Sequence, residues 1–196
     1  MKRRRFSFEV CPGAVVLLAG LYFLLPLRWC ARLALTVTVH ELGHVAALIL
    51  CGAQVCGLRM EGCGLVLRCT PPEGALRTVT AALAGPAAGA GLFCILRGLG
   101  YIACAELSLL FSCVNLLPVL PLDGGRILLG LMTMLLGART GERVAYRISI
   151  AITVLLLIAG TVLAFNNGSK APAAAALWLM LAQRNGGAEL FNEKEC

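Results

Sequence analysis

Charged residues are scarce in this 196-residue chain, at 14% of the total, whereas apolar residues make up 59%. Soluble domains average about 25% charged and 45–50% apolar residues. A chain this short cannot hide the apolar excess in a single core. The composition therefore excludes an ordinary soluble domain and indicates a protein whose solvent is lipid.

Histidine and aspartate are also scarce, because the chain has two His residues, His40 and His44, and one Asp residue, Asp123. The ten cysteines include no C-x-x-C pair, so a zinc ribbon is not indicated. Several cysteines fall inside apolar runs, where Cys acts as a small hydrophobic residue. We expect buried or reduced thiols, with disulfides or a second metal site as the alternatives.

The net charge of +7 does not indicate a nucleic-acid partner. Nucleic-acid binding needs basic residues gathered on one water-facing surface. Here most basic residues stand at the ends of apolar stretches, as they do in membrane proteins.

Apolar segments organise the chain. Backbone groups in lipid must bond internally, so these segments are expected to be helices, and the alternation of a β-barrel is absent. The sequence predicts an all-α polytopic membrane protein with about six transmembrane helices, forming one domain over 1–196 with a core at about 31–130. The segments are 10–27, 31–50, 76–96, 101–121, 144–165 and a shorter one at 171–183.

Lys and Arg residues indicate the orientation of these helices. With six alternating helices and a cytosolic N-terminal tail, 13 of the 17 basic residues fall on the cytosolic side. Such residues are enriched in cytoplasmic loops, so both termini are predicted to be cytosolic. The first apolar segment resembles a signal peptide but lacks a clear small-x-small cleavage site. We therefore expect it to remain as a transmembrane helix or signal anchor.

The stretch 52–75 is the long loop between the second and third segments. It contains two apolar halves around the turn Glu61-Gly62-Cys63-Gly64, which predicts a membrane-associated β-hairpin. The free edge of such a hairpin could pair with an extended peptide. A packed loop without that role is the alternative.

An H-E-x-x-H motif, His40-Glu41-Leu42-Gly43-His44, lies within the second apolar segment. Residues four apart share one helix face, so both imidazoles can bind one zinc ion. Glu41 is placed to act as the general base on the attacking water. Ionisable groups about halfway down a membrane helix are costly and by default functional. A purely structural polar pair is the alternative.

A third ligand is needed, because catalytic zinc usually has three protein ligands. Asp123 is the candidate and lies in Pro118-Val-Leu-Pro121-Leu-Asp123-Gly124. The two prolines break helical bonding, and a broken helix is one way to place a carboxylate at membrane depth. The alternative is that Asp123 caps the following helix.

Candidate substrate-binding residues are Asn115, Gly85, Pro86 and Gly124. Asn115 lies in an apolar segment and needs a partner, either a substrate carbonyl or a neighbouring helix. Gly85 and Gly89 form a G-x-x-x-G pair, which is more often explained by close helix packing alone.

These motifs together resemble the site-2 protease family of intramembrane metalloproteases. The resemblance rests on His40-Glu41-Leu-Gly-His44, on Ala84-Gly85-Pro86, and on Asn115-x-x-Pro118-x-x-Pro121-Leu-Asp123-Gly124. It covers about residues 31–130, the three-helix core of the family, and leaves 10–27, 144–165 and 171–183 as additional helices. The resemblance implies one Zn2+ per chain, held by His40, His44 and Asp123.

The resemblance also implies an activity and a location. The family cleaves transmembrane or membrane-adjacent regulatory proteins, so a membrane-embedded protein substrate and a bacterial-type membrane are expected, with no nucleic-acid partner. An extra first helix, and no room for a PDZ or sizeable CBS domain, are most similar to the sporulation branch, which processes a pro-sigma factor. One departure is Gly89, where many members have Asn.

The predicted function is therefore an intramembrane zinc metalloendopeptidase. One alternative is a membrane metal carrier or transporter that uses the same three ligands as a transit site. A second alternative is a catalytically inactive homologue that binds membrane peptides without cleaving them.

Overall fold

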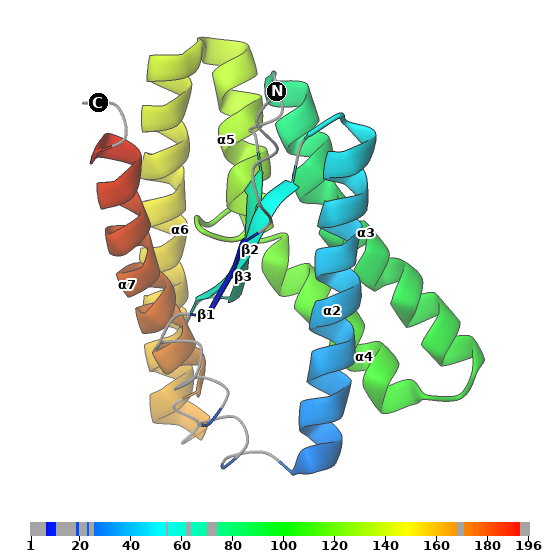
Figure 1. Cartoon of the computed structure of the whole chain (residues 1–196). Coiled ribbons are helices and arrows are strands. Elements are labelled where there is room, and N and C mark those ends of the chain that lie inside the picture. Colours follow the sequence, from blue (N-terminus) through cyan, green and yellow to red (C-terminus); the bar gives the residue numbers. More distant parts are fainter. Residues whose placement is uncertain are drawn as a thin grey trace. The chain divides into compact units, whose positions relative to one another are not determined.

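A computed structural model describes residues 7–10, 19, 23, 26–53, 55–61, 64–69, 74–167 and 171–192. The chain divides into two compact units, Met1–Asn115 and Leu116–Cys196. The described residues form six helices, α2 to α7, and three short strands (Figure 1). The fold is thus predominantly helical, in agreement with the predicted class.

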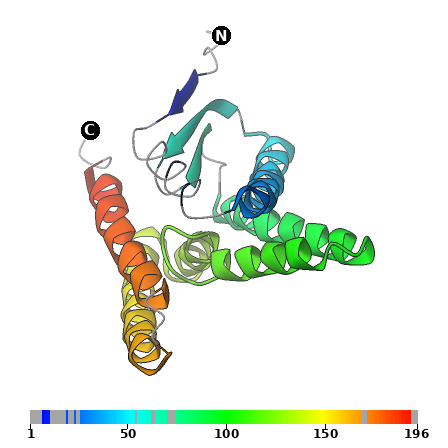
Figure 2. The same cartoon turned by 90° about the horizontal axis from the view of Figure 1, so that it is seen from below.

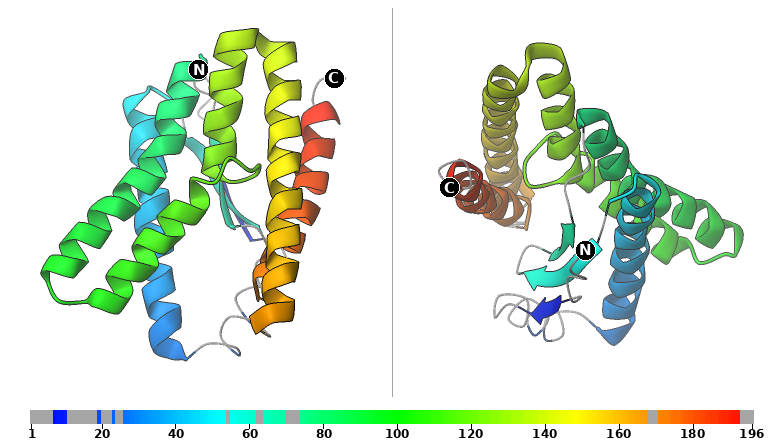
Figure 3. Two further views of the ribbon diagram at one scale, coloured as in Figure 1. Left: turned by 180° about the vertical axis from the view of Figure 1, so that it is seen from behind. Right: turned by 45° about the horizontal axis from the view of Figure 1, so that its top comes forward.

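The first unit is built on three helices, α2 (Leu27–Leu50), α3 (Ala75–Gly98) and α4 (Ile102–Asn115). Helix α3 contacts both α2 and α4, and lies beside α4 along its length (Figures 1 and 3). The approach of α2 to α3 is close at Gly43, where a Cβ would lie 2.6 Å from the Ala84 carbonyl oxygen and 2.7 Å from the Ala88 Cβ. Small residues at such crossings let membrane helices gain contact area.

A small sheet follows α2 in the sequence. Strands β2 (Val55–Glu61) and β3 (Gly64–Cys69) pair antiparallel within the stretch for which the hairpin was predicted, with Glu61 opposite Gly64. The strand β1 (Ser7–Val10), which the sequence did not predict, pairs parallel with β2. The strand order is β1-β2-β3, so β3 is an edge of the described sheet (Figure 2).

The second unit consists of α5 (Asp123–Leu136), α6 (Ala138–Asn167) and α7 (Ala171–Asn192). Helix α6 contacts both other helices and runs beside α7 (Figure 3). Its buried positions follow one stripe of small residues: Gly141, Ala145, Ser149, Thr153 and Gly160. At Gly160 a Cβ would lie 2.9 Å from the backbone of Pro172 and Ala173, so small residues again allow a close helix pair.

Three helices are long and apolar enough to cross a membrane, namely Leu27–Leu50, Ala75–Gly98 and Ala138–Asn166. The chain is therefore a multi-pass membrane protein with three candidate spans in its described part. Helix α5 is a departure from the predicted segments, because none of the six predicted apolar segments covers residues 122–143. The predicted segment 10–27 lies almost entirely outside the described residues.

The predicted segment 101–121 is helical only as far as Asn115. The backbone then leaves the helix at 116–122, around Pro118 and Pro121, and becomes helical again at Asp123. This confirms that the prolines interrupt helical bonding. Helices α4 and α5 have 14 residues each, so each is about 21 Å long, short of the roughly 30 Å bilayer core.

The cysteines whose side chains the structure describes are not disulfide-bonded. Cys51, Cys94, Cys104 and Cys113 are free thiols. This agrees, for these four residues, with the expectation of buried or reduced thiols.

Candidate metal centre

The two histidines lie on the buried face of α2. Buried residues recur every four positions along this helix, at Thr36, His40, His44 and Leu48, which is the spacing of one helix face. The exposed fractions of His40 and His44 are 2% and 8%. Their Nε2 atoms are 3.1 Å apart. The helix therefore points both rings at one another, as the motif predicted.

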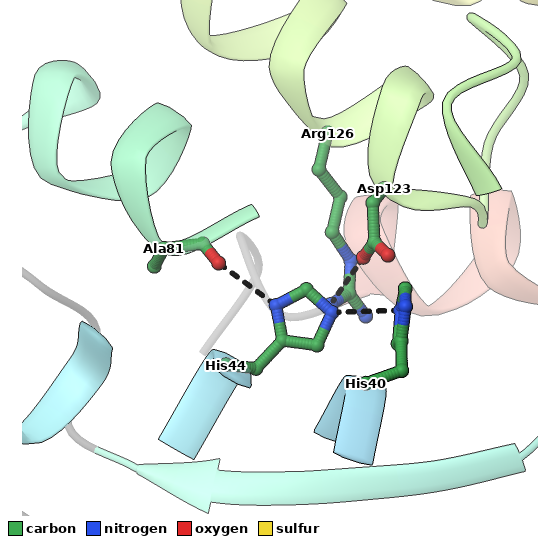
Figure 4. A network of polar contacts seen from close by, with 5 residues as sticks. All are labelled: His40, His44, Ala81, Asp123 and Arg126. Carbon is green, nitrogen blue, oxygen red and sulfur yellow. Dashed lines mark hydrogen bonds and ion pairs between the residues drawn. The ribbon is translucent and has the colours of Figure 1, made fainter. Parts of the chain in front are cut away.

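His44 is oriented by the backbone of α3. Its Nδ1 lies 2.8 Å from the Ala81 carbonyl oxygen (Figure 4). A carbonyl can only accept, so Nδ1 carries the proton and donates it. The lone pair of His44 is then on Nε2, the atom that faces His40. Metal-binding histidines typically donate their second N–H in this way, which fixes the tautomer and the ring orientation.

Gly85 provides the room in which the two rings meet. A Cβ at this position would lie 2.8 Å from His40 Nε2 and closer still to His44 Nε2. Pro86 follows inside α3 and has no N–H to donate to the carbonyl of Ala82, four residues earlier. The Ala84-Gly85-Pro86 element therefore lies directly against the histidines of α2, and Gly85 and Pro86 are both buried.

Replacing Gly85 by Ala is expected to weaken zinc binding by about tenfold or more, because the methyl group would displace both imidazoles. Gly91→Ala in the same helix is the matched control, since a Cβ there meets nothing within 4 Å. Removing a helical glycine should make this control more stable by about 1 kcal/mol. Zinc affinity and thermal unfolding of the two variants measure the difference. Equal zinc affinity would mean that Gly85 does not leave space for the rings.

Phe111 of α4 closes another side of the centre. Its ring packs edge-on against His40, with the ring centroids 5.1 Å apart and an interplanar angle of 86°. One turn later, the Asn115 side-chain amide donates to the Phe111 carbonyl at 3.0 Å. This hydrogen bond lies within α4 itself. From the sequence, Asn115 was expected to bind either a substrate carbonyl or a neighbouring helix.

Asp123 is the first residue of α5. The N-cap position is Leu122, so Asp123 stands one residue inside the helix and not at the cap position that the alternative gave it. Its exposed fraction is 6%. The Arg126 guanidinium lies 3.9 Å from its carboxylate, at the outer limit of an ion pair. Burial of a carboxylate is costly unless charged or hydrogen-bonding groups compensate for the loss of water.

The backbone around Asp123 is crowded by the preceding loop. A Cβ at Gly124 would overlap the carbonyl groups of Leu116 and Leu117, and one at Gly125 would lie 2.5 Å from the Leu120 nitrogen. Both glycines are buried. They allow the 116–122 loop to fold back against the first turn of α5. Gly124 therefore has a packing role in this structure.

The donor types present suit zinc. His40, His44 and Asp123 are buried, and each offers one nitrogen or oxygen ligand atom. Tetrahedral zinc with Zn–N bonds near 2.0–2.1 Å separates two ligand nitrogens by about 3.3 Å. The observed 3.1 Å between the Nε2 atoms is close to this value. Glu41 is partly buried beside His40 on the same helix, where it is not required as a ligand.

Sequence reasoning missed two parts of this centre. The Ala81 carbonyl is a backbone acceptor and has no sequence signal, since any residue at that position would provide it. Phe111 could have been suspected from its place one helical turn before Asn115. Glu106, by contrast, is exposed on α4.

Comparisons with known proteins agree with the geometry. Residues 74–159 match the model of peptidase family M50. The fold is similar to that of a site-2 protease from Methanocaldococcus jannaschii, with a TM-score of 0.68, 20% sequence identity, and coverage of 94% of this chain and 92% of that chain. No curated protein matches the chain. The family match begins after the H-E-x-x-H motif, so the histidine pair supports the same assignment independently.

Proposed function

We propose that the chain is a zinc metalloendopeptidase of the site-2 protease type and that it cleaves a membrane-embedded or membrane-adjacent regulatory protein. The match of residues 74–159 to the peptidase family M50 model and the similarity of the fold to that of a site-2 protease support this proposal. We propose further that one zinc ion is held by His40, His44 and Asp123. The observation that carries the proposal is the buried pair of Nε2 atoms 3.1 Å apart, on a helix long and apolar enough to span a membrane.

Asp123 is proposed as the third ligand on chemical grounds. Two neutral imidazoles leave the charge of a divalent zinc uncompensated in a dry environment, where ion charge is costly. A buried carboxylate supplies both the missing ligand and a negative charge. Asp123 is the only aspartate of the chain, and it is buried at the start of α5.

Glu41 is proposed as the general base. When bound, zinc polarises the scissile carbonyl and makes a water acidic enough to ionise near neutral pH. Glu41 accepts the proton of the attacking water and passes it to the leaving amine. Its position next to His40 keeps the carboxylate near the reacting atoms. The two histidines are four residues apart and therefore share one face of the helix.

The substrate segment must be extended before it can be cut, because helical carbonyls are already hydrogen-bonded. Strand β3 is an edge of the described sheet and offers backbone groups for pairing. We propose that it holds the substrate extended by strand addition. Asn115, Gly85, Pro86 and Gly124 stay as proposed substrate-binding residues, although Gly85 and Gly124 already have packing roles.

The number of spans, the side of the termini and the kind of substrate are proposed from the sequence. We propose about six spans and cytosolic termini. Neither comparison distinguishes a sporulation branch, so a pro-sigma factor is a candidate substrate among other membrane-tethered regulators.

The proposal is tested with purified protein in lipid vesicles and a reporter that contains a transmembrane segment. Chelation of zinc should abolish cleavage, and stoichiometric zinc should restore it, because the metal is required for the hydrolytic step. Zinc content and cleavage are measured on the same sample. The His44→Ala variant, which removes one proposed ligand, should stay inactive when zinc is returned.

The alternatives predict different results in the same vesicles. A metal carrier would transport zinc across the bilayer and leave the reporter uncut. An inactive homologue would bind the reporter and leave it whole with zinc present. Cleavage that persists after complete removal of zinc would contradict the proposed function.

A further inference from the structure

A buried polar network joins the two C-terminal helices. The Gln183 side-chain amide of α7 donates to the Ser149 hydroxyl at 3.0 Å and to the Thr153 hydroxyl at 2.6 Å, both on α6. Thr153 in turn donates to the Ser149 carbonyl at 2.9 Å. Ser149 and Thr153 are fully buried and Gln183 is 5% exposed.

The depth of this network makes it costly to break. Ser149 and Thr153 lie near the middle of the candidate span Ala138–Asn166, where lipid offers no hydrogen bonds. Gln183 is hydrogen-bonded to both of these residues and therefore lies at the same level of the helix pair. A glutamine at this depth is expected to have a function, which packing alone does not explain.

The network also reaches the loop that precedes Asp123. The Leu120 backbone N–H donates to the Ser149 hydroxyl at 2.8 Å. Within the same loop, the N–H of Val119 bonds to Leu117 and the N–H of Leu122 bonds to Val119. Pro118 and Pro121 have no N–H. The Ser149 hydroxyl therefore accepts from both Gln183 and the loop, which fills its two lone pairs.

The loop is in turn packed against the start of α5. Val119 is fully buried, and Gly125 allows the Leu120 backbone to approach within van der Waals contact. A displacement of Leu120 would thus be transmitted to the first turn of α5, which carries Asp123. The contacts run from Gln183 through Ser149 and Leu120 to Gly125 in the first turn of α5, the turn that also carries Asp123, and all of them lie within the second unit.

We propose that Gln183 is a positioning residue for the metal centre, and that it acts through Ser149 and the Leu120 amide to hold the Asp123 carboxylate in place. This role rests on the proposed function, in which Asp123 is a zinc ligand. It gives helices α6 and α7 a part in holding the metal centre.

The test uses Gln183→Met, which keeps the length of the side chain and removes both N–H donors. Leu181→Met is the matched control, because Leu181 is exposed on the same helix. Zinc affinity of Gln183→Met should fall by about tenfold, the lower part of the range for groups that orient ligands. Its kcat should fall at limiting zinc and recover with excess zinc, with KM unchanged. A merely structural loss would not be restored by zinc.

Two further measurements test the individual contacts on the route from Gln183 to the loop. Hydrogen exchange at Leu120 should be faster in Gln183→Met than in Leu181→Met, whether or not Asp123 binds zinc. The double variant Gln183→Met with Ser149→Ala should have the zinc affinity of Ser149→Ala alone, since both act through one hydroxyl. Purely additive losses would contradict the proposed route.

The outcomes distinguish this inference from the proposed function. If Gln183→Met matches Leu181→Met in zinc affinity or in Leu120 exchange, the positioning role is wrong and the zinc ligands are unaffected. If Asp123→Asn binds zinc as tightly as the parent, the ligand assignment is wrong and the positioning role falls with it. In that case, faster hydrogen exchange at Leu120 in Gln183→Met would still show that Gln183 and the loop are linked through the Ser149 hydroxyl.

Discussion

Replacing Glu41 by Gln is expected to reduce peptide cleavage by about 10²–10⁴-fold while leaving one zinc ion bound per chain. Glutamine has nearly the same shape as glutamate but cannot take a proton from water. Glu41 is not among the buried group of potential ligands, so zinc binding should survive. Cleavage of the transmembrane reporter and zinc content, measured on the same preparation, test both halves of the expectation.

The matched control for this variant is Glu106→Gln, the same chemical change at an exposed position of α4. It should cleave at the parental rate, because surface substitutions away from specific interactions have small effects. If Glu41→Gln cleaves as fast as Glu106→Gln, the base is a different group. If it loses zinc together with activity, Glu41 contributes to metal binding and its proposed role is wrong.

Replacing Asp123 by Asn should lower zinc affinity by more than about 100-fold, because even groups that only orient ligands contribute about 10–100-fold. The amide keeps the size of the side chain and removes the negative charge that balances the metal. Activity should disappear with the zinc at ordinary metal concentrations. Competition with a chelator measures the affinity, and reporter cleavage measures the activity.

Arg126→Gln is the control for this second variant. The Arg126 guanidinium lies 3.9 Å from the Asp123 carboxylate, and the Arg126 side chain is 54% exposed. Exposed pairs of this kind contribute about 1 kcal/mol or less, so the control should keep its zinc. Loss of zinc in both variants would show that the charge pair, and not direct binding by Asp123, is what matters.

The helix that carries the metal-binding motif could be predicted from the sequence because its signals are local. His40 and His44 stand four residues apart in an apolar run, so the helical period alone places them on one face. The interruption at Pro118 and Pro121 could be predicted for the same reason, since a missing N–H is a property of the residue itself. The antiparallel strands around Glu61 and Gly64 follow from short apolar runs about a glycine-rich turn.

Helix α5 could not be predicted in the same way. It has only 14 residues, and it begins with Asp123, Gly124 and Gly125, residue types that favour turns. Its two glycines allow the 116–122 loop to pack closely against the helix. This need comes from tertiary packing and not from local preference. Packing overrides local preference here, as it commonly does for short helices.

Contacts between distant residues were also beyond the sequence. The partner of the His44 Nδ1 is a backbone carbonyl at Ala81, 37 residues away. Gln183 and Ser149 are 34 residues apart, and neither belongs to a recognisable motif. Asn115 was expected to bind a distant partner, yet its side chain donates to the Phe111 carbonyl one turn earlier in the same helix.

The crossing of α2 and α3 changes how the H-E-x-x-H pattern should be read in this chain. Its two unspecified positions face opposite environments, because Leu42 is 58% exposed whereas a Cβ at Gly43 would strike Ala84 and Ala88. In the order Leu-Gly, the large residue therefore lies on the exposed side of α2 and the glycine lies on the side that packs against α3. A chain with the order Gly-Leu would satisfy the same pattern and still be unable to bring its histidines to Gly85.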